Sequence, residues 1–313
     1  MERLAQTAEK REKKTMDMTE GSPARIILLF TVPIILGNIF QQLYNIGDAK
    51  VVSFFLDEHA FAAVGMTAVV SNMLIGLING FTQGFGIQVA HAFGAKDVKR
   101  IRRNVAGSAV LAVGLTVFLV AAAFLVIERV LVLLHTPAEL MEPALRYVRI
   151  ILMGIPFSAL YNLSANLLRS LGNSKTPLYC LLSSIFLNIA LDLFLIGVVH
   201  MDIEGAAVAT VISQALSALW VLRFLTGDRA ILKLRIKYLR LRWDWVRRIL
   251  ALGFSGFVMA MTNSIVQVVC NSVLSSFGGD LYVGVMTVIN SVREIVTMPV
   301  MGITGGAEPV IGF

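Results

Sequence analysis

Polar residues recur at helical spacing inside apolar segments of this sequence, and two of them are aspartates. In the first apolar segment they are spaced by three, four and three residues: Asn38, Gln41, Asn45 and Asp48. In a later one they recur every four residues: Ser184, Asn188 and Asp192. Both spacings place the polar side chains on one face of a helix.

A carboxylate surrounded by hydrocarbon costs about 2.5–3.5 kcal/mol and therefore points to a function such as cation binding. Asp192 lies eight residues before His200, or about 12 Å of helix rise. Thr210 lies six residues after Glu204, or about 9 Å of rise. With Asp48 near the same end of its segment, these side chains predict a polar pocket, whose acids would bind a proton or Na⁺.

A second interpretation of the polar stripes stays open. Polar side chains also join membrane helices through hydrogen bonds worth about 0.6–2 kcal/mol each. For Asn38, Gln41 and Ser184 we keep both interpretations. Asp192 is the better functional candidate, because joining helices does not require an ionisable group, whereas Lys50 can pair locally with Asp48.

Composition identifies the elements that carry these residues as transmembrane helices. Apolar residues make up 57% and charged residues 15% of the chain, and its mean hydropathy is +0.77. A soluble domain carries about 25% charged residues. Eight apolar runs reach the roughly twenty residues that a spanning helix needs: 26–47, 60–82, 105–127, 147–168, 178–199, 205–226, 247–273 and 281–303. We therefore predict an all-α integral membrane protein.

The basic residues predict orientation. Of the 27 lysines and arginines, 22 fall in the N-terminal segment and alternate connections, and four in the opposite connections. Basic residues concentrate on the cytoplasmic side. The N-terminus is therefore predicted in the cytoplasm of a cell-membrane protein, and the net charge of +7 does not indicate a nucleic-acid partner.

An internal repeat predicts two units. Residues 64–71 resemble residues 284–291, at an offset of about 220, which indicates parallel repeats. We expect a cytoplasmic segment at 1–25, a six-helix lobe at 26–226, a basic connector at 227–246 and two helices of an incomplete second lobe at 247–313. The connector would lie at the lipid headgroups, where it can contact anionic lipid.

Enzymatic motifs are missing from the sequence. It has no Walker loop, no H-E-x-x-H, no G-x-S-x-G and no paired-cysteine motif. Its four histidines show no metal-ligand spacing. We expect neither an enzyme nor a cofactor other than a coupling ion.

Six segments carry a series of motifs: TEGSP at 19–23, VPIILGNIFQQLYN at 32–45, AAVG at 62–65, GAKD at 94–97, LRSLGNSKTP at 168–177 and GGAEPVIG at 305–312. In this order they resemble bacterial multidrug and toxic compound extrusion (MATE) transporters. The resemblance implies twelve helices in two six-helix lobes, of which about eight are present, so the chain looks C-terminally truncated. It also implies export of organic cations and other drugs in exchange for H⁺ or Na⁺.

The resemblance carries over to particular residues. The first-helix acid of the family matches Asp48, the fifth-helix Asn-x-x-x-Asp matches Asn188 and Asp192, and the sixth-helix threonine matches Thr210. Tyr44, within the second motif, joins Gln41 and Asn45 as a candidate binding residue. Some members have an acid in helix seven, which this chain lacks. That difference favours a site in the first lobe.

The predicted mechanism exchanges a cation for a drug at Asp48 and Asp192. A proton, or Na⁺ held with Asn188 and Thr210, would neutralise the pocket and release a cationic drug, and helix one would rearrange near Pro33. Two alternatives remain: a flippase for lipid-linked saccharides, which would need a more cationic cavity, and a truncated membrane protein that does not transport.

Overall fold

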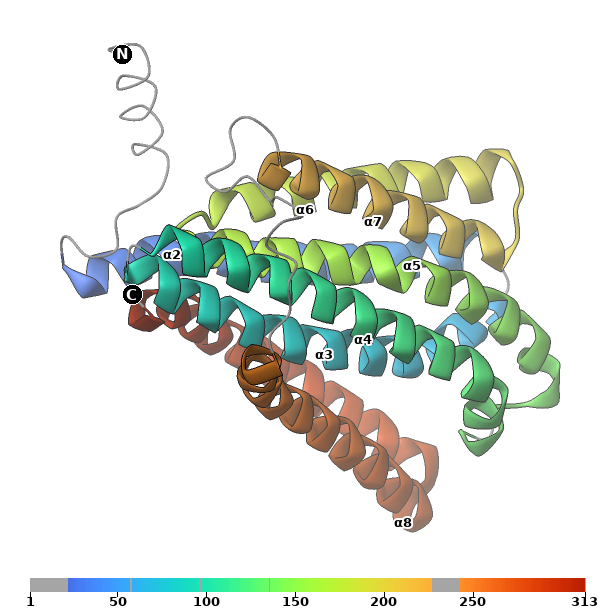
Figure 1. Cartoon of the computed structure of the whole chain (residues 1–313). Coiled ribbons are helices and arrows are strands. Elements are labelled where there is room, and N and C mark those ends of the chain that lie inside the picture. The colour runs from blue at the N-terminus through green and yellow to red at the C-terminus, as the bar shows by residue number, and fades with distance from the viewer. Residues whose placement is uncertain (1–21, 57, 96, 135, 227–242, 313) are drawn as a thin grey trace.

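The computed structural model describes residues 22–312 except 57, 96, 135 and 227–242 (Figure 1). Every regular element within these ranges is helical: α2 (Pro23–Phe55), α3 (Glu58–Gly94), α4 (Val98–Leu133), α5 (Ala138–Ser170), α6 (Lys175–Asp192), the π-helix η1 (Leu193–Val198), α7 (Ile203–Thr226) and α8 (Trp243–Gly312). The predicted all-α class is confirmed. Most of the segment predicted at 1–25 and of the connector predicted at 227–246 lies outside the described residues.

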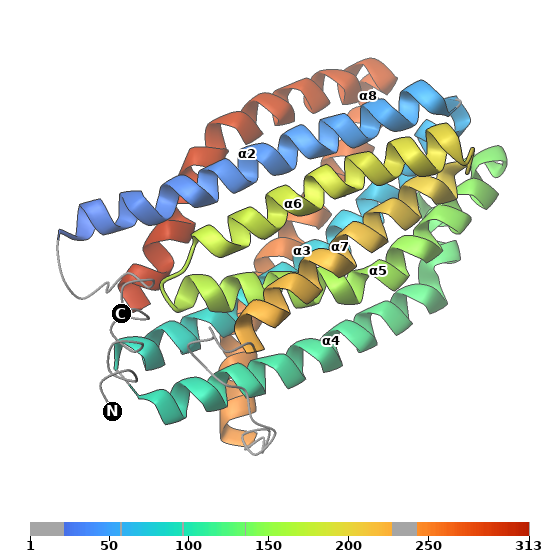
Figure 2. The same cartoon turned by 90° about the horizontal axis from the view of Figure 1, so that it is seen from above.

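Six helices within the described ranges are long and apolar enough to cross a membrane: α2, α3, α4, α5, α6 continued by η1, and α7. They correspond to the first six predicted spans. The spans predicted at 247–273 and 281–303 both fall within α8. Figures 1 and 2 show that α8 turns back on itself, and that its two parts separate from each other away from the turn.

Local signals in the sequence explain where helices begin. Pro23 occupies the start of α2, where its missing N–H costs no helical hydrogen bond. Asp97 caps α4, because its Oδ1 accepts from the backbone N–H of Arg100 at 3.0 Å. Asn173 acts similarly before α6, accepting from the N–H of Thr176 at 3.0 Å.

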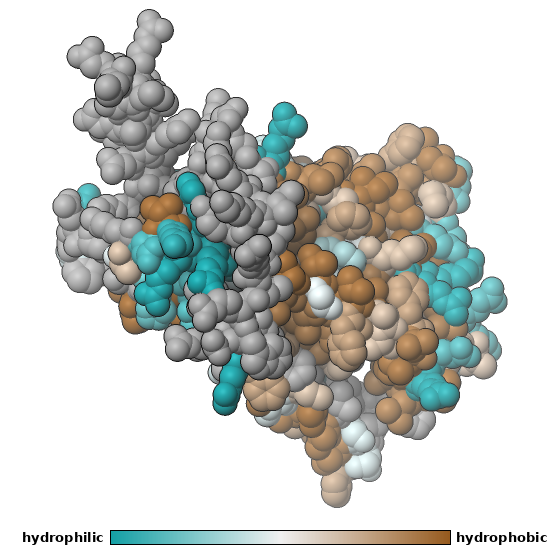
Figure 3. Space-filling model, viewed as in Figure 1, coloured by the Kyte–Doolittle hydropathy of each residue, from teal (hydrophilic) through white to brown (hydrophobic). Residues whose placement is uncertain are grey.

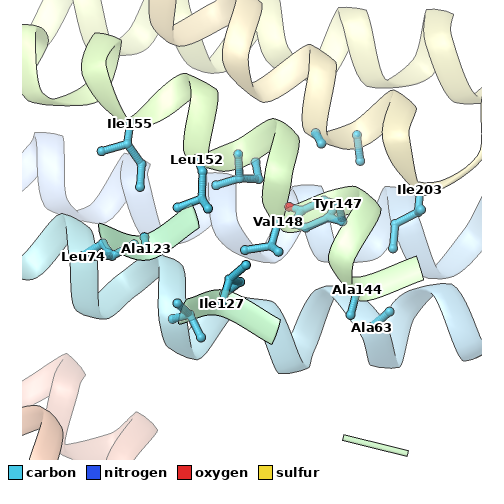
Figure 4. Packing of buried hydrophobic residues seen from close by; sticks show 14 of the residues in the cluster. Ala63, Leu74, Ala123, Ile127, Ala144, Tyr147, Val148, Leu152, Ile155 and Ile203 are labelled. Atoms are coloured by element: carbon cyan, nitrogen blue, oxygen red, sulfur yellow. The ribbon is translucent and has the colours of Figure 1, made fainter. Parts of the chain in front are cut away.

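The core lies around α5, which packs against α3, α4 and α7. Val148, Leu152 and Ile155 of α5 are buried among apolar side chains of these neighbours, including Ile127 and Ile203 (Figure 4). The described outer surface is also apolar, as the brown area of Figure 3 shows; Leu125 of α4 is 83% exposed. An apolar surface outside a packed core is what a lipid environment requires.

Helix α2 lies between two other helices. It contacts α6 on one side and α8 on the other, and Figure 2 shows it lying between them. The end of α2 is close to η1, since a Cβ on Gly197 would lie 3.2 Å from Cε1 of Phe55. This contact holds the last turns of α2 against the end of α6.

Candidate cation and substrate site

Asp48 and Asp192 meet at the end of the bundle where α2 and α6 finish. Asp192 is the last residue of α6 and is fully buried. Asp48 lies two turns before the end of α2 and is half-buried. Their carboxyl groups are within hydrogen-bonding reach of each other. The structure thus brings together the two acids that the sequence singled out.

One oxygen of each carboxyl group has no partner. Oδ1 of Asp48 and Oδ1 of Asp192 are both shielded from solvent, and neither makes a hydrogen bond within the described part of the chain. Two carboxylates within hydrogen-bonding reach of each other, in a medium of low polarity, repel each other strongly. A proton or a small cation between the two groups would remove the repulsion and satisfy both oxygens.

Asn188 holds the other oxygen of Asp192. It is 1% exposed. In the amide orientation that pairs donors with acceptors, its Nδ2 donates to Oδ2 of Asp192 at 2.7 Å and its Oδ1 accepts from the backbone N–H of Thr210 at 3.1 Å. Asn188 therefore links α6 to α7 and leaves Oδ1 of Asp192 available for an ion.

Two tyrosines complete the surroundings of the acids. The Tyr44 hydroxyl lies within hydrogen-bonding reach of the Thr210 side chain. Tyr147 of α5 is buried and lies within electrostatic range of both acids. Tyr147 was not predicted as a site residue from the sequence. It is the first residue of the predicted span 147–168, and an aromatic hydroxyl near the outer end of a span could have indicated that it lies at the depth of Asp192.

The remaining predicted residues are arranged along α2. Gln41 donates to Oδ1 of Asn45 at 3.4 Å, and Asn45 donates to Oε1 of Gln42 at 3.2 Å. These bonds run along one helix and do not reach α6 or α7. Pro33 lies inside α2, which continues as a helix to Phe55.

The oxygen atoms at the site suit a proton or a hard cation. Asp48 and Asp192 contribute carboxyl oxygens and Thr210 a hydroxyl, and oxygen ligands are those that hard cations take. Among the described residues, no group of three or more histidines, cysteines and acids is placed to hold a metal ion. A Na⁺ site at Asp48, Asn188, Asp192 and Thr210 stays a prediction.

The fold defines a multi-pass helical membrane protein in which two acids, Asp48 and Asp192, lie next to each other within the first six helices. The family model described as MatE matches residues 33–194. The chain belongs to the MATE family of transporters, as its motifs predicted.

Named relatives extend the comparison. The chain is 29% identical over 288 residues to a probable multidrug resistance protein of Bacillus subtilis, YpnP, covering 92% of this chain and 64% of the relative. It is 25% identical over 299 residues to the multidrug export protein MepA of Staphylococcus aureus, covering 94% and 65%. The chain thus spans about two thirds of the length of these relatives.

A solved structure shares the fold over most of the chain. It is described as an outward-facing conformation of a multidrug resistance MATE family transporter. It superimposes with a TM-score of 0.88 at 25% identity, covering 95% of this chain and 66% of the other. The helical architecture that the motifs implied is therefore confirmed for the part of the family fold that this chain covers.

Proposed function

We propose that this chain acts in a secondary active multidrug exporter, which expels organic cations and other drugs in exchange for H⁺ or Na⁺. The observation that carries the proposal is the pair of facing carboxyl groups, Asp48 and Asp192, each with a shielded oxygen that lacks a partner. The names of the relatives, a multidrug resistance protein and a multidrug export protein, support drugs as the exported class.

The proposed exchange follows from charge. An empty pair is negative and attracts a cationic drug, whereas a pair that has bound H⁺ or Na⁺ no longer does. Asn188 holds Oδ2 of Asp192 in place, so that binding changes the free oxygens without moving the helix end. A membrane potential contributes about 2.3 kcal/mol per charge per 100 mV, which favours inward movement of the cation.

The proposal extends to architecture. Residues 26–226 would form the six-helix lobe, 227–246 a basic connector at the cytoplasmic lipid surface, and 247–313 the beginning of the second lobe. The N-terminal segment 1–25 would lie in the cytoplasm, and the protein in the cell membrane. A saccharide flippase fits less well, because an acidic pocket repels the pyrophosphate of a lipid-linked sugar.

Replacing Asp192 by Asn tests the proposal. The full-length protein is expressed in cells that lack their own drug exporters. The cells are loaded with a cationic dye, an energy source is added, and the rate of dye efflux is measured. We expect Asp192→Asn to reduce ion-coupled efflux at least tenfold. The matched control is Asp202→Asn, an aspartate near the same end whose side chain is 58% exposed; it should keep efflux. Unchanged coupled efflux in Asp192→Asn would overturn the assignment.

A further inference from the structure

A second polar cluster lies at the opposite end of the bundle from Asp48 and Asp192. It joins α3, α5 and α8 and consists of Thr82, Gln83, Asn166, Arg169 and Glu308. Nε2 of Gln83 donates to Oε2 of Glu308 at 2.8 Å. This bond connects α3 of the first lobe to the last turns of α8, 225 residues away in the chain.

Arg169 supplies a positive charge beside this bond. Its Nη1 donates to Oδ1 of Asn166 at 3.2 Å, and Asn166 in turn donates to the Thr82 hydroxyl at 3.2 Å. Arg169 also interacts electrostatically with Glu308. The cation is thus held by the first lobe and attracts an acid of α8. Neither acid of the candidate site takes part in this cluster.

The backbones of α2 and α8 approach closely at the same end. A Cβ on Gly302 would clash with Cγ1 of Ile35, and one on Gly306 would lie 2.5 Å from Oγ1 of Thr31 and 3.0 Å from its backbone nitrogen. Two glycines four residues apart allow this approach. Figure 1 shows the last turns of α8 against the bundle, whereas the turn in the middle of α8 lies away from it.

The hydrogen bond between Gln83 and Glu308 can open at a lower cost in free energy than the buried contacts among the first six helices. Gln83 is exposed and Glu308 only half-buried, so water can replace each partner when the two separate. Arg169 keeps Asn166 as a partner after separation. By contrast, Ser170 is buried and donates to the backbone oxygen of Gly86 at 2.9 Å between α3 and α5, where water has no access.

We propose that Gln83 and Glu308, with Arg169 beside them, form a latch that holds α8 against the first lobe at the end opposite the acid pair. While the latch is closed, α3 and α8 stay in contact and solvent is excluded from between them at that end. Opening the latch gives solvent access to the side chains between the two helices. The inference rests on the proposed transport function for its role in a cycle, but the latch itself can be tested without transport.

Cysteine labelling measures the seal directly. Asn79 is exposed and lies one turn before Gln83 on the same face of α3, so Asn79→Cys reports from behind the latch. Cys180 and Cys270 are first replaced by alanine. The full protein is labelled in inside-out and right-side-out vesicles with a maleimide that does not cross membranes. We expect Glu308→Gln and Gln83→Ala each to raise the labelling rate at least threefold from the latch side only.

The control is Glu139→Gln, which makes the same chemical change at an exposed glutamate at the other end of the bundle; it should leave the rate unchanged. Equal rates in all variants would overturn the latch. Faster labelling from both sides would also overturn it, because that result indicates general loosening of the fold.

Cross-linking provides an independent measurement that does not require a weakened fold. Gln83→Cys combined with Glu308→Cys should be joined by a bis-methanethiosulfonate cross-linker that spans the length of the two replaced side chains. Slow labelling is then expected at a reporter behind the cross-link. Dye efflux should stop until a reductant cleaves the two disulfides to the reagent. Efflux that continues in the fully cross-linked protein would overturn the latch. Absence of Asp192-dependent efflux in the unmodified protein would instead refute the proposed function, and the labelling rates would still decide the latch.

Discussion

Asn188 and Asp192 are joined across one turn of α6 by a hydrogen bond of 2.7 Å from Nδ2 to Oδ2, while the same amide accepts from the backbone of Thr210 on α7. One side chain thus orients the fully buried acid and fastens two helices. The orientation of the Asp192 carboxyl group therefore depends on Asn188, even if Asn188 does not itself contact the ion.

Removing this amide should therefore affect both stability and transport. In Asn188→Ala, Oδ2 of Asp192 loses the amide that donates to it, and an unsatisfied buried group costs about 1–3 kcal/mol. We expect a lower melting temperature in detergent and reduced efflux. Ser183→Ala is the control, because the exposed Ser183 hydroxyl bonds only to the Tyr179 carbonyl of its own helix at 3.0 Å. Equal melting temperatures of the two variants would contradict the role of Asn188.

Cation binding at the acid pair should stabilise the protein. A ligand that binds only the folded state adds about 2.7 kcal/mol at a hundredfold excess over its dissociation constant. We expect the melting temperature to rise with NaCl relative to KCl if Na⁺ couples, and with falling pH if H⁺ does. Either rise should disappear in Asp48→Asn and in Asp192→Asn, which lack one of the facing carboxylates. A rise that persists in both variants would place the cation elsewhere.

The Tyr44 hydroxyl should contribute to the pocket through its contact with Thr210. Tyr44→Phe keeps the ring and removes the group that lies within reach of the Thr210 side chain. We expect weaker dye binding by the purified protein, because Thr210 loses the group that orients it, and a loss of about 1 kcal/mol of folding stability from the missing hydrogen bond. Tyr179→Phe, at an exposed tyrosine at the other end of α6, serves for comparison. If dye affinity is unchanged in Tyr44→Phe, the hydroxyl has no part in binding.

The crossing of α2 and α8 should tolerate no side chain at Gly302. A valine there would meet Ile35 well inside contact distance, and overpacking costs about 1–3 kcal/mol. Gly305 offers a neighbouring comparison, because a Cβ there would lie 3.7 Å from Ile34, an ordinary contact. We expect Gly302→Val to lower the melting temperature by several degrees and Gly305→Ala to leave it unchanged. Similar values for both would show that the two helices are not in close contact at this crossing.

The sequence predicted the first six helices well because they follow from a local rule. An apolar run of about twenty residues predicts a membrane-spanning helix. A spacing of four residues predicts that two side chains lie on the same face of a helix, so Asn188 and Asp192 could be placed on one face without a structure. The approach of Tyr147 to the acids could not be predicted in this way, since it depends on how α5 packs against α7 and how α7 packs against α6. The same holds for Glu308, whose partner Gln83 lies 225 residues away.

The α2–α8 crossing was also beyond local rules. Gly302 and Gly306 fit the spacing of a close helix contact, but their partner helix is fixed only by the fold. Pro33 was predicted to weaken helix one. The structure places Pro33 between Thr31 and Ile35, the two residues that meet those glycines, so the proposed hinge and the crossing share the same turn of α2.

The π-helix η1 directly follows Asp192, so the number of residues in this stretch matters as well as their identity. In η1, the N–H of Val199 reaches back five residues to the carbonyl of Phe194 at 2.9 Å, so this turn accommodates one more residue than an α-helical turn. Deleting one residue there would let the ordinary winding resume and would move residues 199–202, which connect η1 to α7, by one position relative to Asp192. Insertions and deletions in this short stretch should therefore be selected against even where every polar side chain is retained.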